Sequence, residues 1–147
     1  MQKSLLYDIL KKIKPSKEEI HKVNSLAKEV TNSIKIRDAQ IILGGSIAKD
    51  TWLHKIHDID IFVAFNYNKY KNRSNQLADI LEKRIRHLPI KRLHGSRDYF
   101  QINKGNISIE IIPILRIKKV EQAKNITDIS PLHALWVKKY KIQDEIR

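Results

Sequence analysis

Apolar side chains near the N-terminus recur at the spacing of α-helices. Residues 3–13 place Leu5, Leu6, Ile9, Leu10 and Ile13 three or four positions apart, which predicts an amphipathic helix that ends before Pro15. Ser16 and Glu19 then have the spacing of a capping box, and they predict the start of a second helix of about five turns. Its apolar positions are Ile20, Val23, Leu26, Ala27, Val30 and Ile34. Both helices are expected to be scaffold.

The rest of the chain alternates between short apolar runs and longer periodic segments. Strands are predicted over residues 39–43, 58–63, 90–93, 99–102 and 107–113, with a hairpin turn at 103–106. Helices are predicted over residues 46–52 and 77–88, the latter with Ser74 as its cap and Pro89 as its stop, and a last helix with Ser130 at the cap. Residues 66–75 and 118–129 are typical of polar loops. This order predicts an α/β (α+β) fold, a small mixed β-sheet with helices packed on one face.

Two acids lie one residue apart at the start of the predicted strand 58–63. Successive side chains on a strand point to opposite faces, so Asp58 and Asp60 share one face and Ile59 and Ile61 share the other. Neighbouring carboxylates raise each other's pKa unless a cation lies between them. A hard divalent cation such as Mg²⁺ suits such oxygen ligands.

A glycine pair and a serine precede these acids. Gly44 and Gly45 allow a ligand to approach the backbone closely, and Ser46 is a good N-cap for the short helix 46–52. The free N–H groups at the start of a helix favour an anion. Taken alone, this segment is also compatible with a plain turn, and Asp58 and Asp60 with solvated acids at a strand end. Their succession in this order indicates a site that holds a triphosphate between a metal ion and backbone N–H groups.

The charge balance favours a polyanionic partner. Lys and Arg number 29 against 16 Asp and Glu, so the net charge is +13. Such an excess on a small domain attracts nucleic acid, although a general solubility charge would have the same composition. The basic residues are spread along the chain, so their binding face is not predicted.

Cysteine content and hydropathy exclude several classes of site. The absence of Cys removes disulfides and thiolate metal ligands. No apolar run approaches twenty residues, and the lysine-rich N-terminus lacks the apolar core of a signal peptide. A cytoplasmic location is therefore expected.

The order Gly-Ser, short helix, Asp-x-Asp resembles the signature of the polymerase-beta-type nucleotidyltransferase superfamily. The run at 45–53, Gly-Ser-Ile-Ala-Lys-Asp-Thr-Trp-Leu, is similar to that of the archaeal (class I) CCA-adding tRNA nucleotidyltransferases. Residues 107–113 resemble the strand that bears the third carboxylate of that family, and 129–137 resemble its Thr-Pro-Phe-His helix start. The resemblance covers nearly the whole chain and implies the polymerase-beta-like palm as its fold.

The resemblance also implies a three-carboxylate site. Asp58, Asp60 and Glu110 would be the catalytic residues and the ligands of two Mg²⁺ ions. From the residues alone, Glu110 is only a lone acid on an apolar strand, on the face it shares with Ser108. The family usually has Asp at this position, and Glu is one methylene longer.

The implied reaction is nucleotidyl transfer to RNA. The 3′-hydroxyl of tRNA would attack the α-phosphate of CTP or ATP, and pyrophosphate would leave. The resemblance assigns nucleotide binding to Gly45, Ser46, Lys49 and His133, with Lys55 or His57 as further countercharges.

The length predicts one domain, the catalytic head domain over residues 1–147. In the family, later domains hold the triphosphate, select the base and bind the tRNA. We expect these RNA-binding domains to be absent from this chain and supplied by a second polypeptide in a split enzyme. An excised fragment or a reduced enzyme with relaxed selection are the other interpretations. Two other functions stay open: a standalone nucleotidyltransferase of the toxin–antitoxin type that modifies a protein or tRNA, and a non-catalytic RNA-binding module.

Overall fold

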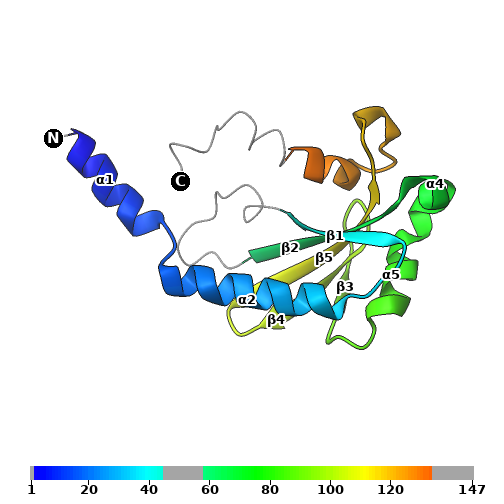
Figure 1. Cartoon of the computed structure of the whole chain (residues 1–147), viewed down its shortest axis with the longest axis horizontal. Coiled ribbons are helices and arrows are strands. Elements are labelled where there is room, and N and C mark those ends of the chain that lie inside the picture. The colour runs from blue at the N-terminus through cyan, green and yellow to red at the C-terminus, as the bar shows by residue number, and fades with distance from the viewer. Residues whose placement is uncertain (1, 45–57, 134–147) are drawn as a thin grey trace.

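A five-stranded mixed sheet forms the centre of the computed structural model, which describes residues 2–44 and 58–133 (Figure 1). In order across the sheet the strands are β1 (Ala39–Gly44), β2 (Asp58–Asn66), β5 (Ile107–Arg116), β4 (Tyr99–Lys104) and β3 (Lys91–Leu93). β2 and β5 run parallel, and every other neighbouring pair is antiparallel. The mixed sheet is therefore as predicted.

The two N-terminal helices also form as predicted. They are α1 (Gln2–Ile13) and α2 (Lys17–Ser33). The capping box at the start of α2 is complete, because the Ser16 hydroxyl accepts a hydrogen bond from the Glu19 backbone N–H at 3.1 Å and the Glu19 carboxylate accepts one from the Ser16 N–H at 3.5 Å. α1 projects away from the body, whereas α2 lies along one face of the sheet (Figure 1). Among the described helices, none is long and apolar enough to cross a membrane.

The hydrophobic core lies between the sheet and the pair α2 and α5 (Leu77–Ile85). Alternate residues of the two central strands point into it and are fully buried: Ile59, Ile61 and Val63 of β2, and Ile107, Ile109 and Ile111 of β5. Asp60 and Glu110 lie at intervening positions, so they point to the opposite face, and both are only partly buried. Helix packing on one face thus leaves the acids on the other.

The prediction of a loop over residues 66–75 was wrong. This segment forms the short helix α4 (Tyr67–Tyr70) and the 3₁₀ helix η1 (Lys71–Gln76). The side chain of Asn66 caps α4 by accepting a hydrogen bond from the Lys69 N–H at 3.0 Å, and the buried ring of Tyr70 packs edge-on against Phe65. The polar composition of this segment therefore led to a wrong loop prediction. The segment is helical because Asn66 caps it and the Tyr70 ring packs against the core.

Two predicted helix starts also differ from the structure. α5 begins after Gln76, and the predicted cap Ser74 lies inside η1 instead. Ser130 has helical backbone angles (φ −53°, ψ −44°) and directly follows the 3₁₀ helix η3 (Ile126–Ile129). The capping side chain is Asn125, which accepts a hydrogen bond from the Thr127 N–H at 3.0 Å. Between β5 and η3 lies one further 3₁₀ turn, η2 (Val120–Gln122).

Candidate active site

Asp60 and Glu110 lie directly opposite each other on the parallel strands β2 and β5. Neighbouring strands are about 4.8 Å apart, so two side chains at the same register and on the same face are close neighbours. The outer strands continue this register across the sheet. Gly44 of β1 lies opposite Asp60, and Gln101 of β4 lies opposite Glu110. The predicted juxtaposition of these acid-bearing strands is confirmed.

Asp58 lies two residues before Asp60, at the first position of β2. It is exposed, and its register partner is Ser108 of β5. Ser108 is held by a hydrogen bond from the Gln101 side-chain amide at 3.0 Å. The open face of the sheet thus carries three carboxylates from two neighbouring strands, at register positions that are two residues apart.

The electrostatics of this face favour a bound cation. The pKa of the Glu110 carboxyl is raised, first by burial and then by the negative charge of Asp60, by a hydrogen bond to Asp60 and by the charge of Asp58. A divalent cation would relieve this repulsion, and hard carboxylate oxygens are the ligands that Mg²⁺ prefers. Within residues 2–44 and 58–133, no three acidic or histidine side chains lie close enough to hold a metal ion as they stand. The donor set fits the ion, and the metal-binding role of the three acids stays a prediction.

A pocket of about 500 Å³ opens beside Asp60 and Glu110. The sheet contributes Asp60, Phe62, Glu110 and Ile112, and the segment from η3 onward contributes Ile126, Thr127, Ile129, Ser130 and His133. His133, which the resemblance assigns to the nucleotide, therefore lines the same pocket as the acids. The volume is that of a site for a small organic ligand.

Gly44 makes room for one wall of this pocket. A Cβ at this position would lie 1.8 Å from Cε2 of Phe62, which is far inside van der Waals contact. The Phe62 ring is buried and occupies the place that a side chain at position 44 would take. The glycine is thus required for packing beside Asp60, in addition to any part in the turn that follows it.

Three other predicted nucleotide-binding residues, Gly45, Ser46 and Lys49, lie outside the described residues. The same holds for the predicted helix 46–52 and for Lys55 and His57. Their roles stay predictions.

The sequence-based prediction missed one buried acid that shapes the pocket. The carboxylate of Asp128 is fully buried and forms an ion pair with Nη1 of Arg97 at 2.6 Å. It also accepts hydrogen bonds from the backbone N–H groups of Leu115 at 2.9 Å, Lys124 at 2.9 Å and Asn125 at 3.0 Å. Asp128 therefore fixes η3, one wall of the pocket, to the strand that carries Glu110. The capping-box spacing of Asn125 and Asp128 was the signal that could have identified it.

Comparisons with known proteins agree with this geometry. Residues 23–146 match the family described as nucleotidyltransferase domain. The CCA-adding enzyme of Nanoarchaeum equitans is 43% identical over 99 residues, which are 67% of this chain and 24% of that enzyme. The CCA-adding enzyme of Sulfurisphaera tokodaii is 34% identical over 145 residues, which are 95% of this chain and 34% of that enzyme. The chain thus spans about a quarter to a third of the length of these relatives.

Solved structures share the fold at low sequence identity. A structure of the RNA terminal uridylyl transferase Cid1 superposes with a TM-score of 0.68 and 15% identity, over 96% of this chain and 40% of Cid1. CdnC of E. coli MS115-1, solved in a complex with HORMA-deltaN, gives a TM-score of 0.60 and 19% identity over 91% of this chain and 48% of that one. The likeness confirms the predicted palm-like architecture.

Proposed function

This chain belongs to the nucleotidyltransferase domain family, and from that premise we propose that it adds CMP and AMP from CTP and ATP to the 3′ end of tRNA. The observation that carries the proposal is the register pairing of Asp60 with Glu110, with Asp58 on the same face and His133 in the same pocket. The similarity to archaeal CCA-adding enzymes supports tRNA as the RNA.

Each of the three acids has a distinct place in the proposed mechanism. Asp58, Asp60 and Glu110 would hold two Mg²⁺ ions, which supply Lewis-acid activation of the attacking hydroxyl and neutralise the triphosphate charge. The Glu110 carboxylate, which is the register partner of Asp60, would accept the proton of the RNA 3′-hydroxyl. Asp58, being exposed, lies where an entering triphosphate would meet the strand.

The nucleotide would enter the pocket beside these acids. We propose that His133 donates a hydrogen bond to the phosphates from the pocket wall, and that Gly45, Ser46 and Lys49 bind them through backbone N–H groups, a hydroxyl and an ammonium group.

The test is incubation of the protein with Mg²⁺, tRNA lacking its CCA end and each labelled nucleoside triphosphate separately. Labelled tRNA is the expected result. Labelled protein or unrelated RNA would indicate a standalone nucleotidyltransferase of another specificity instead. RNA that is bound but unmodified under all conditions would contradict enzymatic function and indicate a binding module.

We further propose that RNA-binding parts like those in the remaining length of the relatives act together with this domain, and that a second polypeptide can supply them. Addition of such a polypeptide should strongly increase CCA addition and its base selectivity. Base-selective addition at full rate by the 147-residue chain alone would contradict this proposal.

A further inference from the structure

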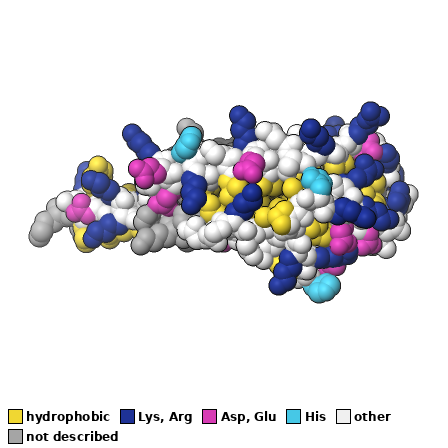
Figure 2. Space-filling view, turned by 90° about the horizontal axis from the view of Figure 1, so that it is seen from below, with side chains coloured by type: hydrophobic (Ala, Val, Ile, Leu, Met, Phe, Trp, Pro, Cys, Tyr) yellow, Lys and Arg dark blue, Asp and Glu magenta, His cyan; other side chains and the backbone are white. Residues whose placement is uncertain are grey.

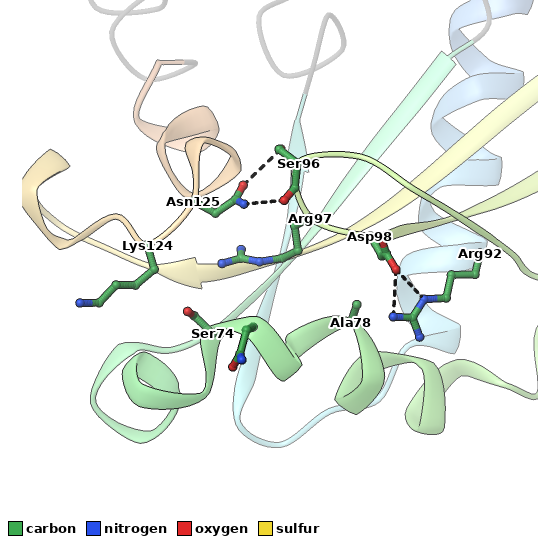
Figure 3. Close-up of a pocket in the computed structure, with 9 residues that line it drawn as sticks. Ser74, Ala78, Arg92, Ser96, Arg97, Asp98, Lys124 and Asn125 are labelled. Atoms are coloured by element: carbon green, nitrogen blue, oxygen red, sulfur yellow. Dashed lines mark hydrogen bonds and ion pairs between the residues drawn. The ribbon is translucent and has the colours of Figure 1, made fainter.

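A second hollow, of about 330 Å³, lies beside the loop that precedes η3. It lies between the start of α5, the loop that joins β3 to β4, and the loop before η3 (Figure 3). Its polar lining residues are Ser74, Asn75, Arg92, Ser96, Arg97, Asp98, Lys124 and Asn125. The two hollows are neighbours along the chain, since Asn125 lines this one and Thr127 lines the acid pocket.

Arg97 brings unsatisfied hydrogen-bond donors into this hollow. Only 7% of its side chain is exposed, and its contacts to Pro113, Thr127 and Asp128 all use Nη1. Within the described part of the chain, Nε and Nη2 of Arg97 have no acceptor. A buried donor without a partner is costly, so these groups favour an acceptor that enters the hollow.

The charges around the hollow favour an anion as that acceptor. The acid that lines it, Asp98, already accepts a hydrogen bond from Arg92 at 3.0 Å (Figure 3) and another from His94 at 3.1 Å. Lys124 is exposed at the rim and, within residues 2–44 and 58–133, forms no ion pair. Together with the hydroxyl of Ser74 and the amide of Asn75, these are the groups that commonly bind phosphate oxygens of nucleic acids.

Further basic residues lie at the same end of the sheet as the hollow. Arg73 directly precedes Ser74 in η1. β5, which contacts η1, ends at the exposed Arg116, and the exposed residues Lys118 and Lys119 follow it. In Figure 2, many Lys and Arg side chains lie at this end of the molecule, away from α1. A polyanion that reaches the hollow would therefore also meet the surrounding positive charge.

We propose that this hollow binds a backbone phosphate of the RNA whose 3′ end enters the acid pocket. The guanidinium of Arg97 and the ammonium of Lys124 would bind the phosphate oxygens, with Ser74 and Asn75 as additional donors. The inference rests on the proposed function, because the RNA 3′ end is proposed to enter the neighbouring acid pocket.

An isosteric charge change tests the hollow itself. Asn75→Asp places a carboxylate in the lining, and Asn72→Asp makes the same change in the same 3₁₀ helix outside it. We measure binding of tRNA lacking its CCA end by fluorescence anisotropy, in EDTA and without nucleotide, so that no catalysis is needed. Asn75→Asp should weaken binding about tenfold, and Asn72→Asp much less. Equal affinities of the two variants would overturn the proposal.

The salt dependence of binding tests the contact from Lys124. Lys124→Gln should reduce the slope of log K against log salt by about 1, as expected for one lost phosphate contact. Lys28→Gln on the exposed side of α2 is the matched control and should leave the slope unchanged. An unchanged slope for Lys124→Gln would contradict the contact.

Two further measurements separate this inference from its alternatives. Calorimetric titration with ATP should give the same affinity for Asn75→Asp and the unaltered protein. A loss of ATP affinity with RNA affinity unchanged would overturn RNA as the source of the phosphate. If the unaltered protein transfers no nucleotide but Asn75→Asp still weakens RNA binding, the proposed function fails and this inference stands. If transfer is intact and both variants bind RNA equally, only this inference fails.

Discussion

Asp60 and Glu110 are direct register partners on two parallel strands, although they lie fifty positions apart in the sequence. Their carboxylates lie on the open face, while Ile59, Ile61, Ile109 and Ile111 occupy the buried face. The helices that bury one face thereby set the position of the acids on the other.

Asp60→Asn should abolish nucleotidyl transfer. It removes a charge from the centre of the acid row without a change of volume, so we expect turnover to fall about a thousandfold or more with the fold intact. Initial rates with labelled CTP and a circular dichroism spectrum check this. Ser108→Ala, on the same face of β5, is the matched control and should keep most of the activity. Turnover of Asp60→Asn equal to that of the unaltered protein would contradict the proposed site.

Glu110→Gln should stabilise the metal-free protein near neutral pH while it lowers activity. Because the folded state raises the pKa of Glu110, folded protein keeps this proton to higher pH than the unfolded chain does. The stability contributed at this site is therefore largest in acid and falls as pH rises from the ordinary carboxyl pKa through the raised one. We expect a gain below about 1 kcal/mol near pH 7, because the carboxylate is partly solvated.

Thermal melting in EDTA at several pH values measures this effect. The difference between Glu110→Gln and the unaltered protein should vanish below the ordinary carboxyl pKa. Mg²⁺ should raise the melting temperature of the unaltered protein more than that of the variant. A variant less stable than the unaltered protein at neutral pH would show that folding does not disfavour the charged form of Glu110.

Gly44→Ala should destabilise the protein through the ring of Phe62. The new Cβ would lie 1.8 Å from a ring carbon, so the ring or the edge of β1 must move, at a cost of about 1–3 kcal/mol. Urea unfolding measures the cost. Phe62→Leu in the Gly44→Ala background removes the atoms in conflict and should recover part of it, whereas independent effects of the two changes would exclude this clash as the cause.

Asp128→Ala should be the most destabilising of these changes. It removes the ion-pair partner of the buried Arg97 guanidinium and the acceptor of three backbone N–H groups. Loss of one partner of a buried ion pair costs about 3–5 kcal/mol. Asp98→Ala is the contrast, because a quarter of the Asp98 side chain is exposed and its partner Arg92 keeps two other acids. We expect Asp98→Ala to cost about 1 kcal/mol. Similar costs for both variants would contradict the role of Asp128 in fixing η3 to β5.

Local patterns were sufficient for much of the scaffold. The Ser16 capping box and the hairpin turn with Gly105 (φ +62°) were predicted because each depends on a few adjacent residues. The alternation along β2 and β5 likewise assigned the acids to one face, since side-chain direction on a strand has a period of two. The sequence by itself thus determined the helices of the N-terminal third, the strands, and which residues share a face.

The tertiary structure decided how these parts meet. No local pattern predicts the parallel pairing of β2 with β5 or the buried ion pair between Asp128 and Arg97, because both join residues about thirty or more positions apart. The family resemblance predicted the strand pairing, whereas the ion pair between Asp128 and Arg97 was not predicted. The short helices after β2 escaped prediction for the same reason, since the buried ring of Tyr70 and not local composition holds them. Helix and turn signals act between near neighbours, whereas strand order and buried ion pairs depend on which surfaces exclude water together, and only the folded chain brings those surfaces into contact.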